Sequence, residues 1–236
     1  MSKLRHVFDR AGRLARIAIA RRRGIRYFPP NYVYLDRLGA PSTVIDVGCG
    51  DDPDFSLRMI DLYGLKAFGV DPTRKHAPAL RAISNSTGGG RFVHVPLAVT
   101  ARDGEIMFNE SAENVSGSVL ADHANIRHDH VISYPVESVG LRSLLARLGL
   151  AKADYLKLDL EGAEYELLDR PDPETMLKFD QIFVEFHHHC LERFDKEDTK
   201  RIVARVEACG FEAFSIDRHN YLFLNRRSFE CGSRKT

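Results

Sequence analysis

The chain has 236 residues, of which 44% are hydrophobic and 28% charged, and its formal net charge is +1. This composition fits a soluble globular chain with a sizeable core and excludes a disordered or fibrous one. The apolar runs fall short of the roughly 18 residues that a transmembrane helix needs. Four cysteines without a close pair do not make a disulfide scaffold, so we expect reduced thiols and a cytoplasmic protein.

The near-zero net charge hides an uneven distribution along the chain. Residues 1–26 carry nine Lys and Arg and a single acid, a net charge of +8, whereas the remainder carries 25 bases and 32 acids, a net charge of −7. We divide the chain into an arm (1–28), a body (29–228) and a tail (229–236). Apolar residues at spacings of three and four predict an amphipathic basic helix over residues 3–20 of the arm: Leu4, Val7, Phe8, Ala11, Leu14, Ala15 and Ala18.

The basic arm has several candidate partners. An anionic membrane surface would attract its arginines, which would place the protein peripherally at the inner membrane. Nucleic acid would attract them too, but no recognised nucleic-acid-binding module or aromatic platform accompanies them, so we do not expect it. The arm could also pack on the acidic body or in a homodimer, and the sequence does not choose between membrane and packing.

Strand and helix patterns alternate along the body. The predicted strands cover 43–47, 66–70, 92–99, 155–160 and 181–186, with a final hairpin of 211–216 and 221–224. Helices are expected after Pro53, over 73–84, over 141–148, from Ala163 and over 196–209. Residues 100–130 read as a polar loop with a hairpin turn at Asp103-Gly104. The alternation predicts one α/β domain with a mostly parallel sheet.

Gly48 and Gly50 follow the first of these strands and precede a helix. Glycines in that position let a ligand approach the backbone at the carboxyl edge of a parallel sheet. A nicotinamide dinucleotide would rest its pyrophosphate on the helix N-terminus, where Asp51, Asp52 and Asp54 would repel it.

S-adenosylmethionine (SAM) carries an ammonium and a sulfonium group and no phosphate, so the charges around the glycine turn favour SAM. Asp46 lies inside the strand, where an acid suits a cationic group. Asp71 ends the next strand, where an acid can take both ribose hydroxyls. An acidic turn without a ligand and a turn that binds another nucleotide are the alternatives.

At these residues the chain resembles the FkbM-type family of SAM-dependent class I methyltransferases. The resemblance covers about residues 42–225, and its segments are VIDVGCGDDPDFS (44–56), GVDP (69–72), PLAV (96–99), DGEIMF (103–108), SGSVL (116–120), DYLKLDLEGAEYELL (154–168) and VEFH (184–187). One departure is the first loop, which has an extra residue relative to the family's usual turn.

The resemblance implies a Rossmann-like, mostly parallel seven-stranded sheet with helices on both faces and an antiparallel last strand. It implies SAM as the cofactor and methyl transfer to a hydroxyl oxygen of a sugar, a glycan or a polyketide-like molecule. Leu97 or Ala98 is then expected beside the adenine. Ser116 and Ser118 match the family's serine-rich loop, and we expect them to touch the acceptor, with ordinary loop chemistry as the alternative.

Lys157, Asp159 and Glu161 share one face at the end of a strand that should be central and apolar. That end of a parallel sheet opens on the ligand crevice, so we expect these residues to bind the acceptor or act in catalysis. An ion pair that merely orders the loop is the alternative. Glu164, one turn later, is expected to order the segment.

Glu185 and His187 share a face at the end of the next strand. Methylation of an alcohol benefits from a positioned base, and the ordinary pKa of histidine suits that task. We predict His187 as the general base, oriented by Glu185 or Asp159; a role in substrate binding or packing is the alternative. A divalent metal among these acids and the histidines is conceivable, but no established ligand spacing supports it, so we expect none.

The sequence therefore predicts a SAM-dependent O-methyltransferase that contacts its cofactor through Asp46, Gly48, Gly50, Asp71 and Ala98. One alternative is an RNA methyltransferase that uses the basic arm. Another is a membrane-associated binding module that keeps the fold without catalysis.

Overall fold

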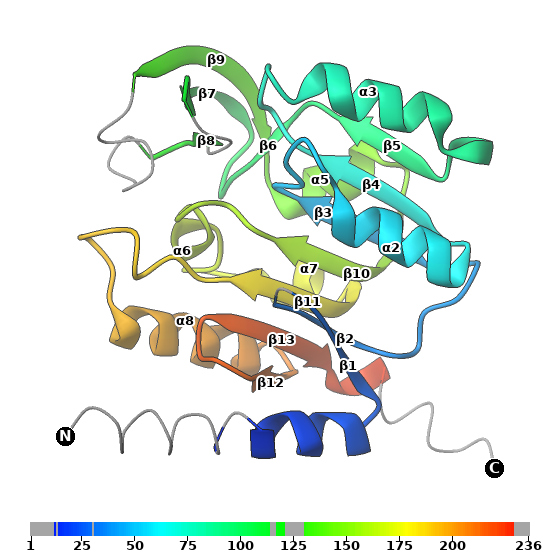
Figure 1. The fold of residues 1–236 in the computed structure, drawn as a ribbon. Helices are drawn as coiled ribbons and strands as arrows, with labels where there is room; N and C mark the ends of the chain where they lie inside the picture. Colours follow the sequence, from blue (N-terminus) through cyan, green and yellow to red (C-terminus); the bar gives the residue numbers. More distant parts are fainter. Residues whose placement is uncertain (1–11, 13, 30, 114–116, 121–129, 229–236) are drawn as a thin grey trace.

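The computed structural model describes residues 12, 14–29, 31–113, 117–120 and 130–228 (Figure 1). A seven-stranded sheet in the order β12-β13-β11-β10-β3-β4-β5 runs through its centre. Only β13 runs antiparallel to its neighbours in this sheet. The predicted Rossmann-like sheet with an antiparallel last strand is confirmed. Its strands are β3 (Thr43–Val47), β4 (Lys66–Val70), β5 (Phe92–Val95), β10 (Ala153–Leu158), β11 (Phe179–Glu185), β12 (Phe211–Ser215) and β13 (Asn220–Asn225).

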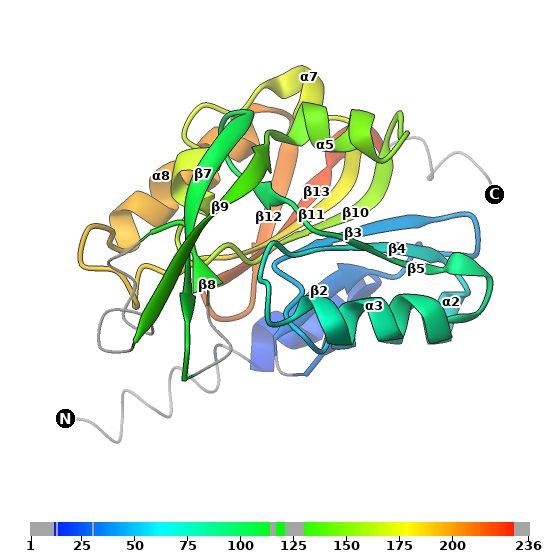
Figure 2. The same cartoon turned by 90° about the horizontal axis from the view of Figure 1, so that it is seen from above.

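Helices cover both faces of the sheet (Figure 2). One face carries the helix of residues 14–22, α2 (Asp54–Tyr63) and α3 (Ala77–Ser86), which pack around Phe55 and Tyr155. The other face carries α5 (Leu141–Arg147), α6 (Glu164–Leu167), α7 (Pro173–Met176) and α8 (Lys196–Ala208). A 3₁₀ turn, η1 (Gly88–Gly90), precedes β5. Within the described ranges, every helix is too short or too polar to cross a bilayer.

The N-terminal segment is more than a helical arm. After the helix of residues 14–22, β1 (Ile25–Phe28) and β2 (Tyr32–Leu35) form an antiparallel hairpin that the sequence analysis missed. This hairpin is bonded to the central sheet, because the Tyr155 hydroxyl donates to the Val33 carbonyl at 2.9 Å. The predicted boundary between residues 28 and 29 therefore cuts through a packed hairpin.

A second sheet, in the order β6-β9-β7-β8, replaces much of the predicted polar loop. The run 92–99 is two strands, because the chain leaves the central sheet after β5 and forms β6 (Ala98–Val99) in the second sheet. The turn expected at Asp103-Gly104 is wrong as a hairpin, since β7 (Gly104–Ser111) pairs with β9 (Val131–Val139) rather than with β6. The short β8 (Gly117–Ser118) pairs with the other edge of β7.

Candidate functional site

The glycine turn after β3 lies between the ends of two neighbouring strands. The Gly48 amide donates to the Val70 carbonyl at 2.9 Å, and the Asp159 amide donates to the Val47 carbonyl at 3.1 Å. A Cβ on Gly48 would lie 1.8 Å from the Asp159 carbonyl oxygen, and its φ is +71°. Only glycine fits this close approach. Gly50 also has a positive φ, but a Cβ there would meet no atom within 4 Å.

A cavity of about 290 Å³ opens beside this turn, at the carboxyl edge of the sheet. Its charged wall contains five carboxylates and one lysine, from the turn, the end of β4 and the end of β10: Asp51, Asp52, Asp71, Asp159, Glu161 and Lys157. The sequence-predicted Gly48, Gly50, Ala98 and Ser118 also lie in this wall. The cavity therefore has the acidic character that a cationic ligand requires.

Asp71 ends β4 and is buried, with 4% of its surface exposed. One carboxylate oxygen accepts from the Gly50 amide at 2.9 Å, and the other accepts from the Thr73 amide at 2.8 Å. Burial raises the pKa of Asp71, but hydrogen bonds from His76 and Thr73 outweigh burial, so the pKa lies below its ordinary value. Asp71 is thus an ionised carboxylate in the wall, with lone pairs left for a ligand hydroxyl.

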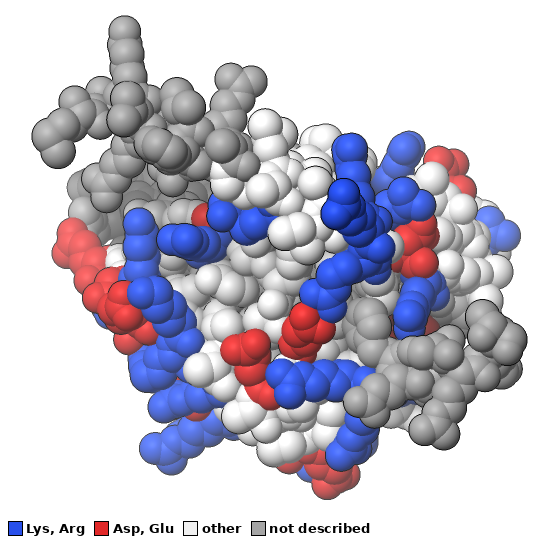
Figure 3. All heavy atoms as spheres, turned by 90° about the horizontal axis from the view of Figure 1, so that it is seen from below, with Lys and Arg blue, Asp and Glu red and all other residues white. Residues whose placement is uncertain are grey.

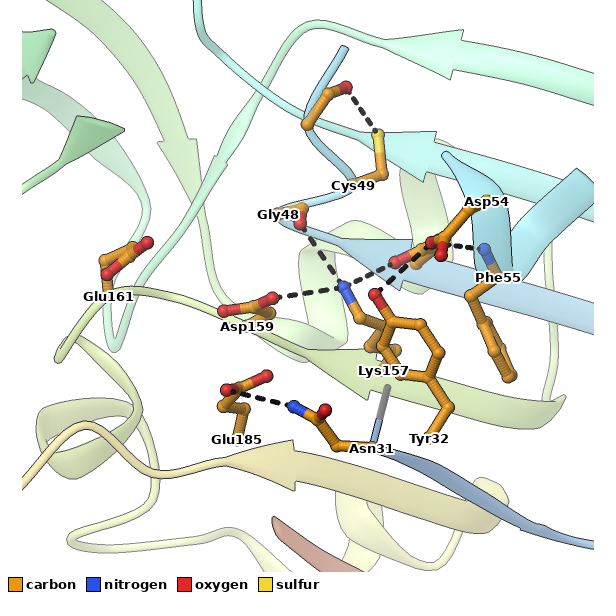
Figure 4. Close-up of polar contacts among 12 residues, drawn as sticks. Asn31, Tyr32, Gly48, Cys49, Asp54, Phe55, Lys157, Asp159, Glu161 and Glu185 are labelled. Carbon is orange, nitrogen blue, oxygen red and sulfur yellow. Dashed lines mark hydrogen bonds and ion pairs between the residues drawn. The ribbon is translucent and has the colours of Figure 1, made fainter. Parts of the chain in front are cut away.

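Asp46 does not lie in the cavity wall, in contrast to the contact predicted for it. It is 1% exposed; one oxygen accepts from the Ser56 hydroxyl at 2.8 Å, and the other lies 3.1 Å from the Lys157 Nζ. Lys157 Nζ also donates to the Gly48 carbonyl and to Asp159, each at 3.3 Å (Figure 4). Burial lowers the pKa of Lys157, but the charges of Asp46 and Asp159 raise it well above its ordinary value. Asp46 therefore reaches the cavity only through this buried ammonium.

Glu164, the first residue of α6, connects the segment after β10 to the segment after β11 through hydrogen bonds to Gly162 and His187. It is fully buried, and one oxygen accepts from the His187 amide at 2.9 Å and lies 3.1 Å from the His187 Nδ1. Its other oxygen accepts from the Gly162 amide at 2.8 Å. The His187 Nε2 consequently faces Asp159 at 3.5 Å and Glu161 at 3.7 Å. Glu164 has the ordering role expected for it.

The position and charge of His187 differ from what a base requires. Burial lowers the pKa of His187, but Glu164, Asp159 and Glu161 raise it to about 10, so the imidazole is protonated at neutral pH. Asp159 and Glu161 line the cavity, whereas His187 lies behind them. The base assignment to His187 remains a prediction, and this geometry disfavours it.

Glu185 also lies behind the cavity wall. One of its oxygens accepts from the Asn31 side-chain amide at 3.5 Å (Figure 4). Burial and the charge of Asp159 raise the pKa of Glu185 to about 7. Burial also raises the pKa of Asp159, although Lys157 and His187 oppose it. The carboxylates of Asp159 and Glu185, at the ends of β10 and β11, thus share the positive charges of Lys157 and His187.

Asp159, Glu161 and His187 each offer one ligand atom, and these atoms lie within 4.8 Å of one another. Among the described residues this is the group that could hold a metal ion. The expectation of an enzyme without a metal remains a prediction.

Ser118 lines the cavity and contacts the backbone of Glu161. Its hydroxyl donates to the Glu161 carbonyl at 3.0 Å, which holds the Glu161 backbone at a φ of +49°, an uncommon conformation for a residue with a side chain. Ser116, which was predicted beside it, lies outside the described residues.

Tyr32, at the start of β2, is a residue of the site that the sequence analysis missed. It lines the cavity, its hydroxyl donates to Asp54 at 3.3 Å, and its ring lies 5.4 Å from the Lys157 Nζ (Figure 4). An aromatic residue far upstream of the glycine turn gave no sign of this placement, because the hairpin that carries it reaches the site only in the folded chain.

Comparison with known proteins gives a family match and distant structural likenesses. The family described as methyltransferase FkbM domain matches residues 15–213. No curated protein matches the chain. A Methanococcus jannaschii fibrillarin pre-rRNA processing protein is 12% identical, with a TM-score of 0.47, 89% of this chain covered and 74% of that one. Magnesium protoporphyrin IX methyltransferase from Synechocystis PCC 6803 is 12% identical, with a TM-score of 0.42 and coverages of 93% and 79%. Likenesses this distant assign no substrate.

Proposed function

Because the chain belongs to the FkbM family of SAM-dependent methyltransferases, we propose that it transfers a methyl group to a hydroxyl oxygen of a sugar, a glycan or a polyketide-like small molecule. The observation that carries this proposal is the cavity beside Gly48, whose wall joins a glycine turn to an acidic edge. The turn would hold the cofactor, and the acidic edge would hold the acceptor hydroxyl.

The residues of the β3–β4 half fit SAM. The open space beside Gly50 leaves room for a ligand against the backbone. The ionised Asp71 offers acceptors for two ribose hydroxyls, and the buried Ala98 offers a small apolar surface for an adenine. When bound, SAM would supply a methyl group on a positively charged sulfur, and the carboxylates of the wall would favour binding of that charge.

At the β10–β11 half, we assign the acceptor to Asp159 and Glu161 because both line the cavity. Asp159 would accept a hydrogen bond from the acceptor hydroxyl and take its proton, while SAM would supply the methyl group and leave as the neutral thioether. His187 and Lys157 lie on either side of Asp159, at 3.5 Å and 3.3 Å, and hold its carboxylate in place. His187 is then a positioning residue, and most of the rate enhancement comes from alignment of the two reactants.

The charge of the wall also bears on the class of acceptor. Five carboxylates against one lysine repel a phosphate-bearing acceptor, so the wall disfavours RNA as the substrate. A neutral hydroxyl compound suffers no such repulsion. This favours sugars, glycans and polyketide-like molecules over the RNA alternative.

The test is transfer of labelled methyl groups from SAM to nucleotide sugars, glycans, lipids and RNA, with SAM affinity measured calorimetrically on the same samples. We expect Asp159→Asn to lower kcat by about 10²- to 10⁴-fold with little change in SAM affinity, the range of a lost acid–base group. Asp61→Asn, on the exposed face of α2, serves as the matched control. A wild-type chain that binds SAM but methylates none of these acceptors would favour a binding module without catalysis. Methyl transfer to RNA alone would favour an RNA methyltransferase.

His187→Gln distinguishes the two assignments of the base. If His187 only positions Asp159, this variant keeps measurable turnover and the pH dependence of kcat. If turnover falls as far as in Asp159→Asn and the pH dependence disappears, His187 is the base.

A further inference from the structure

The helix of residues 14–22 uses one side to pack on the body. Ala20 is 3% exposed and belongs to the core on that face of the sheet. The Arg16 Nε donates to the Ile216 carbonyl at 2.8 Å, and both terminal nitrogens of Arg23, just after the helix, donate to the Glu212 carboxylate at 2.7 Å. Two arginines of the basic arm are therefore occupied by the protein itself.

The opposite side of this helix presents apolar residues to solvent. Leu14 is 61% exposed and Ile19 is 54% exposed, with the exposed Ala15 and Ala18 between them. Among the described residues, these two belong to a small group of large hydrophobic side chains that lie mostly in solvent. Exposed apolar side chains combined with basic ones on one helix face are typical of a helix that lies at a membrane interface.

Exposed arginines border this apolar face. Arg21 and Arg22 lie at the C-terminal end of the helix, and within the described part of the chain neither forms an ion pair. Figure 3 shows the molecule from the side on which this helix lies, with Lys and Arg side chains gathered in several groups. The helix thus combines exposed apolar side chains with uncompensated positive charge.

We propose that Leu14, Ala15, Ala18, Ile19, Arg21 and Arg22, the outer face of this helix, bind an anionic lipid bilayer. The helix would lie in the plane of the interface, with Leu14 and Ile19 among the acyl chains and the two arginines at the headgroups. Nucleic acid fits less well, because its phosphates would leave the apolar side chains in water. A second copy of the chain is the other alternative, and the oligomeric state tests it.

The experiment uses the full chain and co-sedimentation with two kinds of vesicle: phosphatidylcholine alone, and phosphatidylcholine with about 30% phosphatidylglycerol. We expect sedimentation with the anionic vesicles only, weakened by salt. Arg21→Gln/Arg22→Gln should weaken this binding about 30-fold, and Leu14→Ser/Ile19→Ser should weaken it at least as much. Leu62→Ser/Met107→Ser, whose side chains are similarly exposed on α2 and β7, is the matched control and should bind like the wild type.

Several outcomes would overturn the proposal. These are equal binding to both kinds of vesicle, an absence of binding to either, and loss of binding in the control as large as in Leu14→Ser/Ile19→Ser. A wild-type dimer in light scattering that Leu14→Ser/Ile19→Ser converts to a monomer would assign the surface to a second copy. Salt-sensitive RNA binding lost only in the arginine variant would assign it to nucleic acid. None of these outcomes depends on methyl transfer, so the proposal stands or fails independently of the reaction.

Discussion

The two halves of the cavity are built in different ways. At β3 and β4 the backbone makes the site, since glycines with positive φ and a strand-end aspartate lie within about one βα unit of sequence. At β10 and β11 side chains make the site, and they are held by residues from other segments, including Glu164 of α6 and Asn31 between β1 and β2. The β3–β4 half is therefore specified locally, whereas the β10–β11 half depends on long-range packing.

The largest effect is expected at the contact between the two halves. Gly48→Ala would place a Cβ against the Asp159 carbonyl and should lower the free energy of unfolding by about 3 kcal/mol or more. SAM binding should be lost as well. Urea denaturation and calorimetry measure both quantities.

Gly50→Ala is the matched control, because its φ is also positive but its Cβ meets no atom. It should cost about 1 kcal/mol, the cost of a left-handed conformation alone. Equal losses of stability in the two variants would contradict the role given to the close approach at Gly48.

The next effect is expected at the buried ammonium of Lys157, which contacts Asp46 of β3 and Asp159 after β10. Lys157→Met leaves Asp46 and Asp159 without their shared cation and should cost about 3–5 kcal/mol, the usual result of breaking a buried ion pair. Adding Asp46→Asn should restore part of this loss, as measured by urea denaturation. A double variant no more stable than Lys157→Met would show that Asp46 and Lys157 are not coupled.

The free energy of unfolding should also depend on pH, because the carboxylates around His187 raise its pKa. The folded pKa of His187 is raised to about 10, so its stabilising contribution is complete below the ordinary pKa of about 6.5 and is lost as the pH rises to about 10. His187→Gln should flatten this fall when unfolding is measured from pH 6 to pH 10. An unchanged slope in His187→Gln would contradict the raised pKa of His187.

The smallest effect is expected from metal removal. Because the protonated His187 already supplies positive charge between Asp159 and Glu161, we expect chelation with EDTA to leave turnover unchanged. Turnover that falls on chelation and returns with added Mg²⁺ or Mn²⁺ would instead assign Asp159, Glu161 and His187 as ligands.

The places of the predicted site residues follow the same division between local and long-range structure. Gly48, Gly50, Asp71 and Ala98, the predicted cofactor contacts, lie in the cavity wall, and their contact with the cofactor stays a prediction. Asp46, in β3 just before the glycine turn, was also predicted as a cofactor contact, but its side chain points inward to Lys157. The sequence pattern of a strand shows which residues share a face of that strand, but it does not show which of the two faces borders the cavity.

By itself the sequence determined the alternation of strands and helices, the glycine turn and the acidic character of the edge, because each depends on residues close together in the chain. Only the tertiary structure decided which residues line the cavity. In the folded chain Tyr32 lines the cavity, and His187 lies behind Asp159. Carboxylates surround His187 and raise its pKa, which keeps the imidazole protonated. The tertiary structure also turned the apolar residues Leu14 and Ile19 outward. These outcomes depend on burial and on charges from distant segments, and neither is set until the chain is packed.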